Sequence, residues 1–187
     1  MAEINLLIPK ERVGALIGSN GEVKKRIETT LKVELTVDSA GGRVLIKEGA
    51  ETHPLNVLKA KDVVSAISQG FSPERSFILF DDDKILNTID LREIFGRNDN
   101  QISRIKGRII GREGKSRRLI EQTLGAILSI YGHTISIIGS YERVIIAREA
   151  IQMLIQGSQH ASVFRFLRLK RAEVKKKSKT ELWEKPI

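Results

Sequence analysis

The chain has 187 residues, which is long enough for two small domains, and its 41% apolar and 29% charged residues are typical of a globular protein. It has no cysteine, which excludes disulfide scaffolds, thiolate metal sites and cysteine nucleophiles. No apolar run approaches the roughly 20 residues that a membrane-spanning helix needs, so we expect no such helix. The net charge of +9 favours a polyanionic partner, although a solvated basic face explains a charge excess equally well.

The first half of the chain begins without the cationic segment and long apolar core of a signal peptide, so we expect a cytoplasmic protein. Apolar residues then follow strand or helix spacing, and proline and glycine separate the segments. In chain order they predict a strand at 3–9, a short helix at 11–18, a helix at 21–31, a hairpin of strands at 33–37 and 43–47, and a long helix at 54–70.

The second half predicts the same order of elements. It follows a linker in which Ser72 and Pro73 have the cap and first-position proline of a short helix. The predicted elements are a strand at 85–91, helices at 101–110 and 115–124, a hairpin at 126–132 and 133–139, a closing helix at 141–157, and a basic amphipathic helix that ends in a tail.

The two halves also share an internal repeat. A shift of 93 residues aligns "GALIGSNGEVKKRIETTL" (14–31) with "GRIIGREGKSRRLIEQTL" (107–124), with eight identities in eighteen positions and no gap. A shift of 87 aligns "AISQG" (66–70) with "MLIQG" (153–157), which places about six extra residues of the first copy near "KEGAETHP". The repeat indicates a tandem duplication of one unit.

Each copy has a Gly-x-x-Gly turn that opens a basic helix, at Gly18–Gly21 and at Gly111–Gly114. The first backbone N–H groups of a helix and its dipole attract phosphate, and glycines allow a sugar-phosphate chain to approach the main chain closely. Long cationic side chains beside each turn can reach neighbouring phosphates. We therefore predict a tandem phosphate-binding module, with a tight helix–helix turn and solvated cations as the alternative.

No other chemical site is predicted. The segment "GREGKS" resembles the end of a P-loop, but that motif requires a glycine five residues before Gly114, where the chain has Ile109. Asp81–Asp83 lack further positioned ligands and the three histidines lack metal-ligand spacing, so neither a metal nor a cofactor is expected. Without a convergent acid–base constellation we expect no enzyme; a ribonuclease or nucleotide hydrolase is the competing class.

The order strand, helix, "IGxxG", helix, hairpin, helix resembles the KH domain, whose GxxG loop clamps about four nucleotides of single-stranded nucleic acid. The few residues before the first helix fit the eukaryotic type. The resemblance implies an α+β fold with two tandem eukaryotic-type (type I) KH domains, each a three-stranded antiparallel sheet packed against three helices, plus a basic C-terminal helix. The expected domains are 1–71 and 84–158, with a linker at 72–83 and the basic helix and tail at 159–187.

Longer segments, among them "IKGRIIGREGKSRRLIEQTLGA" and "AREAIQMLIQGSQHASVFRFL", are similar to the two-KH small-ribosomal-subunit assembly factors of the partner-of-Nob type, in their compact archaeal form. This implies binding to small-subunit ribosomal RNA near its 3′ end and the positioning of maturation enzymes there. The implied partners are the rRNA-maturation endonuclease and the rRNA adenine dimethyltransferase. A protein-interaction scaffold with weak or lost RNA binding, or a general KH-type factor in RNA turnover, are the alternatives.

Charge separates the two copies. Residues 1–96 contain 13 Lys+Arg and 15 Asp+Glu, a net of −2, whereas residues 97–187 contain 19 and 8, a net of +11. We therefore predict that the second KH domain is the stronger RNA site and that the first is adapted for contacts with protein or with the other domain.

The predicted RNA-binding residues are the two loops with the cations and one apolar residue beside them: Gly18, Ser19, Asn20, Gly21, Lys24, Lys25, Arg104, Lys106, Arg108, Ile110, Gly111, Arg112, Glu113, Gly114, Lys115, Arg117 and Arg118. Candidates for an apolar groove under the bases are Val13, Leu16, Ile17, Ile105, Ile109 and Ile110. The C-terminal cations that can extend the RNA track are Arg165, Arg168, Lys170, Arg171 and Lys175–Lys177, with a disordered tail as the alternative for the last ten residues.

Overall fold

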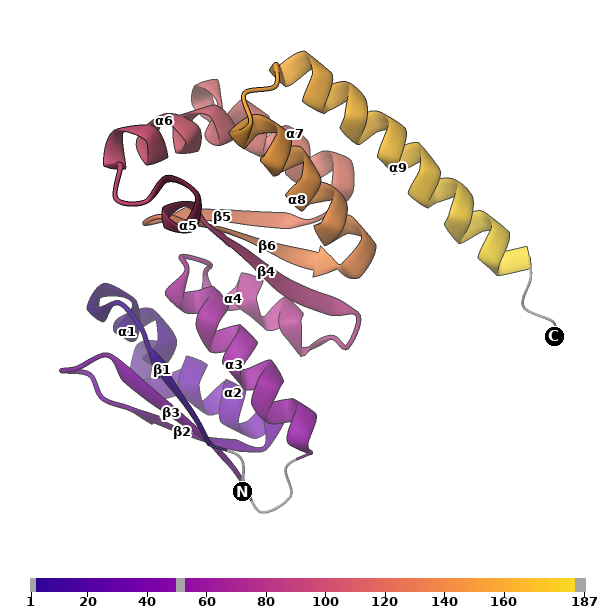
Figure 1. The fold of residues 1–187 in the computed structure, drawn as a ribbon. Helices are drawn as coiled ribbons and strands as arrows, with labels where there is room; N and C mark the ends of the chain where they lie inside the picture. Colours follow the sequence, from indigo (N-terminus) through magenta and orange to yellow (C-terminus); the bar gives the residue numbers. More distant parts are fainter. Residues whose placement is uncertain (1–2, 50–52, 184–187) are drawn as a thin grey trace. The chain divides into compact units, whose positions relative to one another are not determined.

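The computed structural model describes residues 3–49 and 53–183, the side chains of 177–183 excepted. The chain divides into two compact units, Met1–Leu86 and Asn87–Ile187. Each unit has one three-stranded sheet with helices packed against it (Figure 1), and the strand orders are β1-β3-β2 and β4-β6-β5. The two units therefore repeat one topology, which confirms the predicted α+β class and the duplication.

The first unit follows the predicted order of elements. Its helices and strands are β1 (Glu3–Leu7), α1 (Lys10–Ile17), the 3₁₀ turn η1 (Ser19–Gly21), α2 (Glu22–Leu31), β2 (Val33–Val37), β3 (Arg43–Glu48), α3 (Pro54–Ser68), α4 (Pro73–Ser76) and the 3₁₀ turn η2 (Phe77–Phe80). The surplus loop of the first copy falls between β3 and α3, where residues 50–52 lie outside the described residues.

The second unit has the same frame with two additional helices. Its elements are β4 (Lys84–Asp90), α5 (Leu91–Phe95), α6 (Asp99–Ile110), the 3₁₀ turn η3 (Arg112–Gly114), α7 (Lys115–Leu124), β5 (Ile127–Tyr131), β6 (Thr134–Ser140), α8 (Tyr141–Ile155) and α9 (His160–Trp183). The last helix packs along α7 and α8.

The core of each unit lies between the sheet and its helices. In the first unit buried residues alternate along β2 and β3, whereas β6 of the second unit is buried at five successive residues. The buried residues of the helices recur at helical spacing, so that each helix contributes one apolar face to the core. In the first unit this layer includes Ile27, Leu31, Val33, Leu35, Val44 and Ile46, and in the second Ile120, Leu124, Leu128, Ile135 and Ile137.

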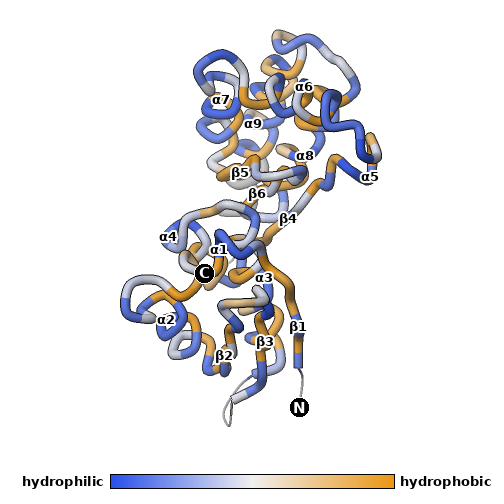
Figure 2. Tube along the Cα trace, turned by 90° about the vertical axis from the view of Figure 1, so that its left-hand side faces the viewer, coloured by the Kyte–Doolittle hydropathy of each residue, from blue (hydrophilic) through white to orange (hydrophobic). Residues whose placement is uncertain are grey.

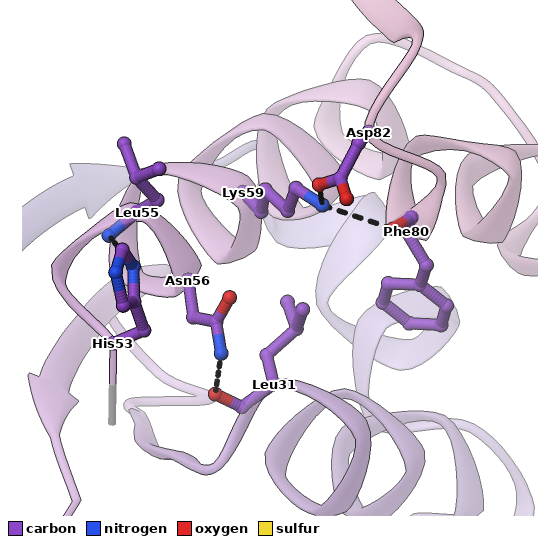
Figure 3. Close-up of polar contacts among 7 residues, drawn as sticks. All are labelled: Leu31, His53, Leu55, Asn56, Lys59, Phe80 and Asp82. Atoms are coloured by element: carbon purple, nitrogen blue, oxygen red, sulfur yellow. Dashed lines mark hydrogen bonds and ion pairs between the residues drawn. The ribbon is translucent and has the colours of Figure 1, made fainter. Parts of the chain in front are cut away.

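A lysine fixes the segment that follows α3. The Lys59 ammonium donates to the Phe80 carbonyl at 3.1 Å and pairs with the Asp82 carboxylate (Figure 3). One turn earlier, the Asn56 amide donates to the Leu31 carbonyl at 3.1 Å, at the end of α2. Helix α3 therefore holds both its preceding helix and its following segment through backbone carbonyls.

Two features of the second unit differ from the prediction. Helix α5 was not predicted; the Asp90 carboxylate accepts the Arg92 N–H at 2.8 Å and caps a single turn that Gly96 ends at φ 60°. Helix α6 begins two residues earlier than predicted because the Asn98 side chain accepts the Gln101 N–H at 3.1 Å. The missed signal in both places was a capping side chain.

The C-terminal helix continues beyond residue 178, where the alternative of a ten-residue tail would have ended it. Its backbone is helical as far as Trp183, and residues 184–187, the end of the expected tail, lie outside the described residues. Across the described ranges, no helix combines the length and apolar content needed to span a bilayer.

Candidate nucleic-acid interface

The two glycine loops have almost the same backbone. The first glycines, Gly18 and Gly111, have φ/ψ of 73°/177° and 72°/173°. The second glycines, Gly21 and Gly114, have 78°/12° and 74°/13°. All four lie at positive φ, where a side chain is strained, so the spacing of the glycines in the sequence follows from this one turn.

The two glycines of each loop have different surroundings. A Cβ added to Gly111 would lie 2.7 Å from the Cβ and 2.9 Å from the backbone nitrogen of Ser116, and one added to Gly18 would lie 2.5 Å from a methyl group of Val23. A Cβ added to Gly21 or Gly114 would meet nothing within 4 Å. The first glycine is therefore required by packing inside the turn, whereas the second leaves bare main chain on an open face.

The residues between the glycines share a conformation but not a charge. Asn20 and Glu113 both have φ 54°, in the left-handed region, with ψ of 24° and 27°. Asparagine tolerates this region better than glutamate. The neighbours Ser19 and Arg112 are exposed, so the second loop presents a guanidinium where the first presents a hydroxyl.

A carboxylate anchors each loop helix to the neighbouring strand. The Glu28 carboxylate accepts the Leu35 N–H at 2.9 Å, and the Glu121 carboxylate accepts the Leu128 N–H at 2.8 Å. Both pairs are related by the 93-residue shift. The helix that carries the loop and the strand that borders the expected groove are thus joined in the same way in both units.

Four predicted cations of the second unit lie on its surface, and three of them belong to the loop or to the first turn of α7. Arg104 and Arg112 are exposed and make no hydrogen bond or ion pair with another described residue. Lys115 lies 3.8 Å from the Glu113 carboxylate, and Arg118 donates to the Glu113 carbonyl at 2.6 Å. The two latter side chains therefore lie around the loop itself, and Glu113 is partly neutralised there.

Three other predicted cations are held by internal contacts. Lys106 donates to the Gly132 carbonyl at 2.7 Å, in the turn between β5 and β6. Arg108 donates to the Ser158 carbonyl at 2.7 Å, and Arg117 lies 3.5 Å from Glu121. Lys106 and Arg108 therefore tie α6 to distant parts of the unit, whereas the Arg117 pair lies within α7.

His160, the first residue of α9, contacts the backbone of Arg108. His160 Nε2 lies 2.8 Å from the Arg108 carbonyl, and its ring packs against Phe164 with centroids 5.9 Å apart. The histidine thus connects the start of the C-terminal helix to the end of α6. Its role in the described structure is packing and hydrogen bonding.

The first unit offers fewer available cations. Lys24 lies 3.8 Å from Glu28, and the Arg26 guanidinium lies 4.5 Å from the centre of the Phe77 ring, whereas Lys25 is exposed. Arg12 points inward and donates to the Ile67 and Phe71 carbonyls at 2.8 and 2.5 Å. Although α2 and α7 both appear as mostly hydrophilic tubes in Figure 2, only α7 follows a loop with its own exposed guanidinium.

The apolar groove candidates separate into two groups. Val13, Leu16, Ile105 and Ile109 are at most 4% exposed and form part of the core. Ile17 and Ile110, the residues directly before each first glycine, are half-buried and lie next to the loop. They are the two candidates that keep exposed surface beside the loop.

The acidic linker segment shows no convergence of ligands. Asp82 pairs with Lys59, and Asp83 lies 2.6 Å from Lys84. Within the described part of the chain, no group of three or more His, Asp or Glu side chains is placed to hold a metal ion.

Comparison with known proteins agrees with this geometry. Residues 85–172 match the model of the eukaryotic-type KH domain (KH-domain type I) that describes the second KH domain of PNO1, and residues 3–64 match the general KH-domain model. Both matches include a glycine loop.

Relatives extend over nearly the whole chain. The KH domain-containing protein MJ0443 of Methanocaldococcus jannaschii is 46% identical over 180 residues, which cover 96% of this chain and 78% of the relative. The pre-rRNA-processing protein PNO1 of Coccidioides immitis is 26% identical over 172 residues, covering 91% and 68%. One chain in the crystal structure of an a/eIF2alpha–aDim2p–rRNA complex from Pyrococcus horikoshii is 43% identical, with a TM-score of 0.86 over 92% of this chain and 95% of that one. The chain therefore belongs to the family of tandem KH-domain proteins of the PNO1 type.

Proposed function

We propose that this protein binds single-stranded RNA and acts in ribosome biogenesis, where it binds small-subunit rRNA near its 3′ end. The main support is the second glycine loop, in which Gly114 presents open main chain beside the exposed Arg112. A sugar-phosphate backbone fits such a surface because no Cβ holds it away and long cations neutralise it. The relatives give the cellular context, since one is a pre-rRNA-processing protein and another lies in a complex with rRNA.

The protein's role in this proposal is to hold RNA and to position the maturation enzymes. The endonuclease that matures the 3′ end and the rRNA adenine dimethyltransferase are the proposed partners, and the cytoplasm is the proposed location. The protein itself does not cleave RNA in this proposal. Incubation of labelled RNA with the pure protein and Mg²⁺ should leave the RNA intact, and protein-dependent cleavage would contradict the proposal.

A pair of matched loop variants tests the RNA site. Arg112→Asp with Glu113→Asp changes the net charge by −2, and Ser19→Asp with Asn20→Asp changes it by the same amount in the first loop. We expect the second-loop variant to lose at least tenfold in affinity for a single-stranded oligonucleotide of the rRNA 3′ region at fixed salt, because carboxylates would face phosphate. The first-loop variant should lose much less. Fluorescence anisotropy measures both affinities, and circular dichroism checks the fold.

The same experiment distinguishes the alternatives. An unchanged affinity in the second-loop variant would favour a protein-interaction scaffold. Equal binding of a scrambled oligonucleotide of the same length would favour a general KH-type factor in RNA turnover over a factor with a ribosomal target. A larger loss in the first-loop variant would reverse the predicted ranking of the two domains.

A further inference from the structure

The second unit has a pocket at the end of α7 remote from the glycine loop. Its volume is about 200 Å³, and α7, α8 and α9 all contribute to its lining. Leu124, Ile146 and Val174 supply apolar surface, and the first two are nearly buried, at 6% and 8% exposure. The pocket therefore offers an apolar surface between three helices that are already fixed by packing.

Cationic side chains from two helices border this apolar surface. Arg143 comes from the first turn of α8, and Arg171 and Lys175 come from α9. The Arg143 guanidinium lies against the turn that ends α7, because a Cβ added to Gly125 would be 2.8 Å from its Nη1. Neither guanidinium forms a hydrogen bond or ion pair with another described residue. Two guanidinium groups beside an apolar surface suit a ligand that has a planar ring and an anionic group attached to it.

The exposed face of α7 connects this pocket to the glycine loop. Lys115, Arg118 and Gln122 are exposed and follow one another at spacings of three and four residues, which places them along one side of the helix. A ten-residue helix is about 15 Å long, a distance that a few nucleotides of an extended strand can span. The exposed polar side of α7 thus leads from Gly114 to the pocket.

We propose that the pocket binds an unpaired nucleotide of the same RNA strand, beyond the nucleotides held at the glycine loop. Its base would lie over Leu124, Ile146 and Val174, and a guanidinium of Arg143 or Arg171 would stack on it or pair with its phosphate. This inference depends on the proposed function, because the glycine loop supplies the first contact with the strand. An RNA strand fits better than an acidic peptide, because the pocket and the glycine loop lie at opposite ends of the same helix, α7.

Paired variants and two RNA lengths test the pocket. The test variant is Arg143→Gln with Arg171→Gln, and the control is Arg97→Gln with Arg148→Gln. The control removes the same charge from exposed positions of the second unit that neither line the pocket nor belong to the predicted RNA-binding residues. The RNA probes are a tetranucleotide, the length that the loop clamps, and strands extended to about twelve nucleotides on the 5′ or the 3′ side.

We expect the test variant to bind one of the two extended strands roughly tenfold more weakly than the unsubstituted protein, with the tetranucleotide nearly unchanged. The extended side that responds gives the direction of the strand along α7. Unchanged binding of both extended strands would overturn the proposal and would favour an acidic protein segment as the ligand of the pocket. An equal loss in the control would also overturn it, because the effect would then be general charge. In either case tetranucleotide binding at the glycine loop, and with it the proposed function, would stand.

Discussion

In the first unit the loop after α1 reads Gly-Ser-Asn-Gly, and in the second the loop after α6 reads Gly-Arg-Glu-Gly. Their backbone angles nevertheless agree within 5°. Main-chain shape is therefore set by the glycines and by the packing below them, and it does not depend on the two residues between. Those two residues are exposed, and they determine the charge that each loop presents to a polyanion.

The cations that accompany the two loops also differ in how many of them have partners within the protein. Lys24 and Arg26, after the first loop, lie against Glu28 and Phe77. By contrast, Arg112 in the second loop and Arg104 on the helix before it have no polar partner among the described residues. The two loops thus share one backbone conformation but differ in the charge around them. The comparison predicts that changes to the glycines affect folding in both units, and that changes between the glycines affect mainly RNA binding.

The largest expected effect concerns the first glycines. Gly111→Ala should destabilise the second unit by about 2–5 kcal/mol, because φ 72° with ψ 173° is a region restricted to glycine and the new Cβ would approach the Ser116 backbone. Gly18→Ala should act similarly on the first unit. Urea unfolding gives the free energy, and hydrogen exchange of α2 and α7 assigns the loss to a unit.

The second glycines supply the control for that comparison. Gly114→Ala adds a Cβ to open space and should cost only about 1–2 kcal/mol, from the left-handed backbone alone. It should nevertheless weaken RNA binding. If Gly114→Ala destabilised the unit as much as Gly111→Ala, the division of roles between the two glycines would be wrong.

An exchange between the loops should have an intermediate effect. Glu113→Asn gives the second loop the residue of the first, removes a carboxylate from the phosphate surface and suits φ 54° better. We expect RNA affinity to rise about two- to fivefold at low salt, with the gain shrinking as salt increases. Anisotropy titrations across a salt series measure it.

The reverse exchange completes this test. Asn20→Glu should lower whatever RNA affinity the first unit has and should leave the second unit unaffected. A fall in affinity on Glu113→Asn would instead mean that the Glu113 carboxylate makes a favourable contact with the RNA, and the simple charge comparison would fail.

The smallest expected effect is a pH dependence in α3. Burial raises the pKa of the Asp62 carboxyl above its ordinary value of 3.8, and Lys61 partly opposes the shift. The folded state therefore favours the protonated acid, so the contribution of Asp62 to stability is lost as pH rises through its folded pKa. Asp62→Asn should raise the melting temperature slightly at neutral pH and not below pH 3.8. The exposed Glu149, at the matching position of α8, is the control; an equal gain from Glu149→Gln would argue against burial as the cause.

Much of the fold could be predicted, because local residue spacing indicates the helices and strands and the repeat gives their order in both units. The bounds of β2 and α7 agree with the prediction, since alternation, helical spacing and glycine punctuation are all local. The partners of Lys106 and Arg108 could not be predicted, because their acceptors lie 26 and 50 residues away. The pocket beside Gly125 was also missed, since it forms only where three helices meet.

The carboxylates of Glu28 and Glu121 have a consequence beyond the groove. Leu35 and Leu128 belong to β2 and β5, which are outer strands of their sheets, and each gives its amide to the glutamate instead of to the neighbouring strand. An outward amide on an outer strand is the group with which a foreign chain begins to add itself to a sheet. Because Glu28 and Glu121 occupy this amide, β2 and β5 each offer one donor fewer to a foreign strand at that border of their sheet.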